Sequence, residues 1–186
     1  MTTDNIKQGT RQDFAYVESM GSAVRVGYGL TPVDGQEGQY KWHEVTLYKK
    51  QYPIVTLQTV KDAIIADINA RTDEKVLNGY QFTPDGAEEA ITVWLSKESQ
   101  TNFSEAHRLQ MVPVKFKLNE DEQKQPIYHT FTEFSELDRF YTGGVQYINQ
   151  CLNEGWAEKD GIDWAPYEAL FPATEDNGQQ QEPAEE

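Results

Sequence analysis

The chain has 186 residues and a formal net charge of −15, from 31 acidic and 16 basic residues. Nucleic acids and anionic membranes are bound through clustered Lys and Arg, and the nearest approach to a cluster is Lys49-Lys50, so we expect neither partner. The one cysteine, Cys151, cannot form an internal disulfide, the polar start shows no signal peptide, and no apolar run of about 18 residues exists, so we expect a cytoplasmic protein.

The first part of the chain is expected to be flexible and then to form strands. Residues 1–13 are polar, which predicts a flexible N-terminus. Residues 14–52 form the predicted N-terminal β segment, because "SAVRVGYGL" (22–30) and "YKWHEVTLYKK" (40–50) alternate apolar and polar positions. The stretch between these two runs is rich in Pro, Gly and acid, which indicates a loop.

A main α+β domain is predicted over residues 53–160, and it opens with a helix. Thr56 has the character of an N-cap. Apolar residues then recur at gaps of 3, 4 and 4, which places one stripe on a helix that ends near Arg71: Leu57, Val60, Ile64 and Ile68.

Two hairpins and a second helix follow. The first hairpin, near residues 79–95, turns at Pro84-Asp85-Gly86. The second hairpin, near 113–131, contains the cleanly alternating "VKFKL". Between the hairpins we expect a helix over 97–109, with three residues facing inward: Phe103, Ala106 and Leu109.

Ser96 stands where the first hairpin ends and the second helix starts. The order Ser-Lys-Glu-Ser admits a nucleophile with a neighbouring base, but it is not the Ser-x-x-Lys order of lysine-activated serine enzymes. An N-cap explains the residue fully, since serine accepts the unpaired N–H groups of a first turn and Glu98 suits the positive end of the helix. We therefore assign Ser96 to capping.

The longest predicted helix covers residues 133–154. Its stripe has gaps of 3, 4, 4, 3 and 4 and consists of Phe134, Leu137, Tyr141, Val145, Ile148 and Leu152. Thr132 is the expected N-cap and Gly155 the expected C′ glycine. Gly143-Gly144 weakens the middle of the helix, which predicts a kink or a close backbone contact there.

The end of the chain divides into an amphipathic aromatic segment, 161–171, and an acidic tail, 172–186. The tail has five acids and no base, so we expect it to be disordered. Trp164, Tyr167 and Phe171 are spaced by 3 and 4, which gives one helical face. These rings either belong to the core or form a partner-binding surface, and they are the candidate partner-binding residues.

No constellation in the sequence points to catalysis, a cofactor or a metal. The three histidines, His43, His107 and His129, lack the spacing of metal ligands. The acidic turn "NEDEQK" (119–124) lacks the pattern of a calcium loop. We therefore expect a protein that is not an enzyme, with no catalytic residue, no cofactor and no metal ligand.

Several stretches, taken together, are similar to a known family. They are "KWHEVTLYKK", "VKDAIIADINARTDEKVLNGYQF", "VWLSKESQTNF", "PVKFKL", "YHTFTEFSELDRFY" and "YINQCLNEGW". In this order they resemble a phage and prophage domain of unknown function that is often found at the C-terminal end of tail-fibre-type virion proteins. The short free-standing form from phages of gut bacteria is the most similar, and the likeness covers roughly residues 40–160. The resemblance implies a virion setting and carries over no active site.

Fold and function expectations follow from these observations. We expect an α+β fold in which three main helices pack on short antiparallel hairpins. The leading hypothesis is a non-enzymatic tail or tail-fibre protein, either a structural subunit or an assembly factor. Its partners would be other phage tail or virion proteins, with a homo-oligomer as a further option, and it would pass from the host cytoplasm into the virion. The alternatives are an acidic inhibitor or DNA mimic that binds a host nucleic-acid enzyme, and a hydrolase of cell-surface glycan.

Overall fold

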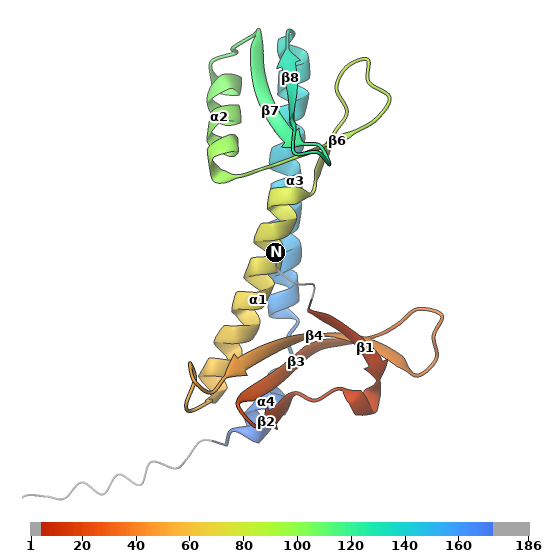
Figure 1. Ribbon diagram of the computed structural model, residues 1–186, viewed down its shortest axis with the longest axis vertical. Helices are drawn as coiled ribbons and strands as arrows, with labels where there is room; N and C mark the ends of the chain where they lie inside the picture. Colours follow the sequence, from red (N-terminus) through yellow and green to blue (C-terminus); the bar gives the residue numbers. More distant parts are fainter. Residues whose placement is uncertain (1–4, 173–186) are drawn as a thin grey trace, which may run out of the picture. The chain divides into compact units, whose positions relative to one another are not determined.

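The computed structural model of the protein describes residues 5–172 and has the expected α+β fold (Figure 1). The chain divides into two compact units. Residues 6–63 and the described residues from Asp163 onward form the sheet unit, whereas Asn5 and residues 64–162 form the helix–hairpin unit. The boundaries between the units therefore lie at 63/64 and 162/163, and not at the predicted 52/53 and 160/161. The acidic tail expected over 172–186 lies outside the described residues except for Pro172.

The sheet unit contains one four-stranded antiparallel sheet with the order β1-β4-β3-β2. Its elements are β1 (Ile6–Thr10), a 3-10 turn (Arg11–Asp13), β2 (Val17–Met20), β3 (Ala23–Pro32), β4 (Gln39–Tyr48) and the short helix α4 (Ala165–Leu170). Its core includes Phe14, Val24, Val26, Tyr28, Trp42 and Leu47.

The flexible N-terminus predicted over residues 1–13 is wrong for residues 6–13. Strand β1 pairs with β4 from Ile6 opposite His43 to Thr10 opposite Gln39. An edge strand draws its stability from backbone pairing and can expose polar side chains on both faces. The polar sequence of β1 therefore carries no apolar alternation from which a strand could be predicted.

The helix–hairpin unit holds the longer helices and both hairpins. Its elements are most of α1 (Leu57–Asn78), β5 (Tyr80–Phe82), β6 (Ile91–Val93), α2 (Lys97–Arg108), β7 (Val114–Glu120), β8 (Pro126–Phe131) and α3 (Phe134–Asp160). The expected hairpins are β5–β6 and β7–β8, and Figure 1 shows α2 and β7–β8 beside the first half of α3. The core is rich in rings: Tyr80, Phe82, Phe103, Phe131 and Phe140 all lie in it.

The predicted start signals hold for two of the three helices. Thr56 Oγ1 accepts the backbone N–H of Thr59 at 3.2 Å. Ser96 Oγ accepts the N–H of Ser99 at 3.1 Å, so Ser96 is a cap, as predicted. The cap predicted at Thr132 is wrong, because α3 begins one residue later, after Glu133, without a side-chain cap bond.

Three glycines of α3 mark contacts that helix propensity alone cannot show. A Cβ on Gly143 would lie 2.6 Å from Tyr80 Oη, which confirms the close contact expected at Gly143-Gly144. The prediction that Gly155 ends the helix is wrong, since α3 continues to Asp160. Gly155 is instead a contact point with α1, where a Cβ would lie 2.4 Å from Thr72 Oγ1.

The buried face of α3 is rotated from the predicted stripe. Of the six stripe residues only Leu137 is fully buried. The buried face consists of Leu137, Phe140, Gly144, Cys151 and Gly155, together with the carboxylate residue Glu136. Leu109, expected to face inward on α2, is 54% exposed because the chain leaves the helix at this residue.

We expect Gly155→Ala to destabilise the protein by about 1–3 kcal/mol, as overpacking at a close contact does. In a Thr72→Ala background the added methyl has room, since Oγ1 and Cγ2 are removed and the remaining Cβ of residue 72 is 3.4 Å away, an ordinary contact distance. In this background the higher helix propensity of alanine should offset most of the destabilisation that Gly155→Ala causes. Urea unfolding of the four variants of this cycle measures the coupling, and equal costs in both backgrounds would contradict the contact.

Candidate functional site

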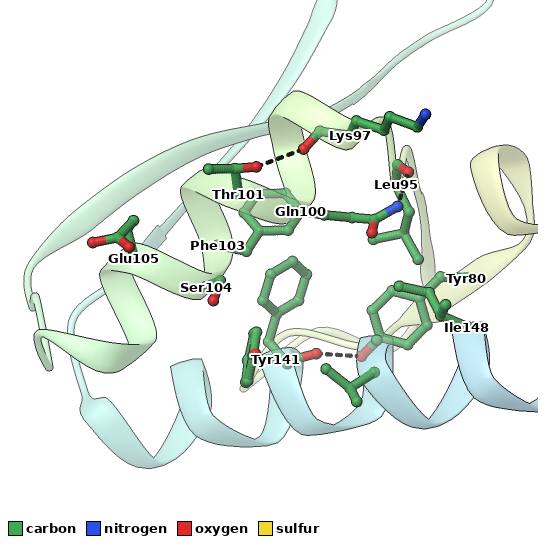
Figure 2. Close-up of a pocket in the computed structure, with 13 residues that line it drawn as sticks. Tyr80, Leu95, Lys97, Gln100, Thr101, Phe103, Ser104, Glu105, Tyr141 and Ile148 are labelled. Atoms are coloured by element: carbon green, nitrogen blue, oxygen red, sulfur yellow. Dashed lines mark hydrogen bonds between the residues drawn. The ribbon is translucent and has the colours of Figure 1, made fainter.

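The candidate site is a groove of about 480 Å³ between α2 and α3 in the helix–hairpin unit (Figure 2). It is partly open to solvent. Thirteen residues line it: Tyr80, Leu95, Lys97, Gln100, Thr101, Phe103, Ser104, Glu105, Phe140, Tyr141, Gly144, Val145 and Ile148. Its floor is therefore apolar and aromatic, and its α2 rim is polar.

Tyr80 lies in the floor of the groove and is held in place there by a hydrogen bond. Its hydroxyl donates to the backbone carbonyl of Phe140 at 2.8 Å, and Figure 2 shows this bond beneath the groove. Gly143 allows Tyr80 to lie against α3, because a Cβ there would be 2.6 Å from the Tyr80 hydroxyl oxygen, whereas a Cβ on Gly144 would make an ordinary contact with the ring at 3.6 Å. Burial raises the pKa of Tyr80 to about 12, while the charge of Arg139 acts in the opposite direction.

The α3 wall is the uncovered half of the predicted apolar stripe. Tyr141, Val145 and Ile148 line the groove, and none of them is fully buried. Val145 is 38% exposed. An apolar stripe that its own unit leaves half covered is typical of a surface that contacts another protein.

The α2 wall carries the polar rim. Gln100 donates to the carbonyl of Leu95 at 2.7 Å, and Thr101 Oγ1 donates to the carbonyl of Lys97 at 2.9 Å. Glu105 bonds Arg108 at 2.7 Å, and this hydrogen bond lowers the pKa of the fully exposed Glu105 carboxyl. Lys97 and Glu105 stand at opposite ends of this wall (Figure 2).

The residues of the groove do not form a nucleophile–base pair within the described part of the chain. His107, the nearest histidine in sequence, stacks on the Tyr141 ring at 4.2 Å and contacts Asp138 Oδ1 through Nε2 at 2.8 Å. His129 contacts the buried Glu136 through Nε2 at 3.0 Å. Glu136 also accepts the backbone N–H of Asp85, and this second hydrogen bond holds the β5–β6 loop to α3. Within residues 5–172 no group of three or more potential metal ligands occurs.

The candidate partner-binding set of Trp164, Tyr167 and Phe171 does not form one exposed face. Tyr167 is wrong as a docking residue, because its side chain is 1% exposed and its hydroxyl donates to the carbonyl of Gly27 at 2.6 Å. Trp164 and Phe171 are half-buried, and the Lys61 ammonium lies 5.3 Å from the Trp164 ring centroid. The Lys61–Glu168 ion pair also ties α4 to the start of α1. This segment therefore helps to build the sheet unit.

The groove was missed at the level of sequence, although the signal for its α3 wall was present. The stripe predicts Tyr141, Val145 and Ile148 as one face. Periodicity identifies such a face without telling which half of it the chain itself covers. The α2 wall has no comparable signal, because its residues are polar.

No family model, curated protein or solved structure compared with this chain matches it. The likeness to the phage domain therefore stays a prediction from the quoted stretches. Among the described residues no helix is long and apolar enough to cross a membrane.

We expect Tyr80→Phe to lower stability at pH 7 by about 1 kcal/mol, through the lost bond to Phe140. It should also flatten the alkaline loss of stability. The raised folded-state pKa of Tyr80 gives stability that is complete below the ordinary value of 10 and is lost as pH rises toward about 12. Urea unfolding between pH 7 and 12 measures both effects, and an equal alkaline loss in the two proteins would contradict the assignment.

We expect Tyr167→Phe to cost about 1–3 kcal/mol, because the carbonyl of Gly27 loses a buried donor. Tyr48→Phe is the matched control, since Tyr48 is 60% exposed. Chemical denaturation of the full chain gives both values. If the Tyr167 variant were as stable as the control, Tyr167 would not be the internal anchor described above.

Proposed function

We propose that the chain is a non-enzymatic phage virion protein, associated with the tail or its fibres, that acts through protein–protein contacts at the groove between α2 and α3. It serves as a structural subunit or an assembly factor, and its partners are tail or virion proteins. It is made in the host cytoplasm and enters the particle during assembly. The observation that carries the proposal is the half-covered stripe of Tyr141, Val145 and Ile148.

The physical support lies in the composition of the groove. Protein-contact surfaces combine an apolar, often aromatic, centre with a polar rim. Here the rings of Tyr80 and Tyr141 and the side chains of Val145 and Ile148 supply the centre. The α2 side chains supply the rim, and most of their hydrogen-bonding groups face local partners. Such a surface is suited to recognising the shape of a partner.

The resemblance to the phage domain supports the setting. The stretch "VWLSKESQTNF" contains the start of α2, and "YHTFTEFSELDRFY" with "YINQCLNEGW" covers most of α3. Three of the six stretches that carry the resemblance therefore overlap the two groove walls, while the other three lie in β4, in α1 with β5, and in β7.

The alternative of a DNA mimic has weaker support. A mimic needs unpaired carboxylates in a row at the spacing of phosphates. On the face that α1 and α3 share, Arg71 binds Glu158 at 2.6 Å and Asp67 at 3.1 Å, and Lys75 pairs with Glu154. These acids are matched by bases of the same unit, so they do not offer such a row.

Virions purified from infected cells test the proposal. The chain should be found in particles by mass spectrometry, and it should co-purify with tail proteins during infection. Absence from both would contradict the proposal.

A variant pair tests the role of the groove. Val145→Glu places a charge in the groove at a position that is already 38% exposed, and we expect at least about a tenfold loss of incorporation, in line with the cost of a buried unpaired charge. Tyr128→Glu is the control, because Tyr128 on β8 is 52% exposed and does not line the groove. Equal incorporation of the two variants would exclude the groove as the contact surface.

A further inference from the structure

We infer that the groove binds the same groove of a second copy of this chain, in an antiparallel dimer with two-fold symmetry. The inference rests on the proposed function only in taking the groove as a protein-contact surface. A two-fold interface must be self-complementary, because the same patch faces itself. Both walls of the groove have this property.

The α2 wall carries a self-complementary charge pattern. Lys97, Thr101 and Glu105 follow one another at intervals of four residues, and all three line the groove. Residues four apart lie on one helix face, so Lys97 and Glu105 are about 12 Å apart along the helix axis with Thr101 midway. A two-fold axis through Thr101 brings Lys97 of each copy to Glu105 of the other copy.

The α3 wall repeats the same symmetry with apolar groups. Tyr141 and Ile148 flank Gly144 and Val145, which lie at the middle of the stripe. Figure 2 shows that Lys97 and Ile148 belong to one end of the groove, whereas Glu105 and Tyr141 belong to the other. The rotation that pairs the charges therefore also places the Tyr141 ring of one copy against Ile148 of the other, with Val145 near the axis.

The two charges are available for such pairing. The Lys97 ammonium makes no ion pair within residues 5–172, and Glu105 is held by Arg108 in an exposed pair. An exposed pair of this kind contributes little, so Glu105 can be shared with a second copy. Each chain has a net charge of −15, which opposes association at long range. Attraction between two copies must therefore come from local contacts, namely this charge match and the apolar α3 wall.

Charge exchange tests the dimer directly. At about 0.15 M salt, where the screening length is about 8 Å, sedimentation equilibrium of the full chain should show a dimer. Lys97→Glu and Glu105→Lys should each raise the dimer dissociation constant about 10- to 100-fold, because each turns two symmetry-related attractions into repulsions. The double variant Lys97→Glu/Glu105→Lys should regain the dimer, since its charges match again after rotation.

Mixing the two single variants is the sharpest arm of the experiment. One variant then presents two acids and the other two bases, so the mixture should form a heterodimer although each variant alone is monomeric. Lys115→Glu and Glu98→Lys are the matched controls, because they make the same charge changes at exposed positions that do not line the groove. Thermal unfolding by circular dichroism confirms that each variant is folded.

A monomeric wild-type chain overturns the inference. So does a dimer that the single variants leave unchanged, or a mixture that fails to associate. A monomer that still enters virions would reject the dimer and leave the proposed function standing. A dimer that is absent from virions and does not co-purify with tail proteins would reject the proposed function and leave the dimer standing.

Discussion

Helix α3 carries more apolar surface than its own unit covers, and the groove beside α2 results from this excess. One face, with Leu137, Phe140 and Cys151, is packed into the ring-rich core. The adjoining face, with Tyr141, Val145 and Ile148, is only partly covered and lines the groove. Apolar area in contact with water costs about 25 cal/mol per Å², so a second covering surface would be favourable.

Close contacts of small residues explain why α3 can support both faces. Gly143 leaves room for the Tyr80 hydroxyl, and Gly155 leaves room for Thr72 of α1. Ion pairs from Arg71 and Lys75 to the end of α3 then fix how the two helices lie against each other. The first half of α3 is left to pack against α2 and the hairpins. The floor of the groove is part of the rigid core, which suits a preformed contact surface.

Local signals could be predicted from the sequence. The caps at Thr56 and Ser96 and the turn at Pro84-Asp85-Gly86 depend on neighbours in the chain, and the structure has all three. Features that depend on distant partners were missed. Strand β1 exists because β4 pairs with it, and Tyr167 is buried because Gly27 accepts its hydroxyl. Gly155 looks like a helix end until Thr72 is placed beside it. The groove belongs to this second group, because a stripe shows which residues share a face and not which of them are covered.

The central claim is that another protein chain covers the half of the α3 stripe that this chain leaves exposed. The rate at which a thiol reagent modifies a Val145→Cys variant measures this most directly, with the buried Cys151 as an internal reference. The account predicts that modification at position 145 slows as the protein concentration rises, whereas a cysteine placed at the exposed Thr130 on β8 reacts at a constant rate. Equal and constant rates at both positions over the whole concentration range, and with tail proteins added, would contradict it.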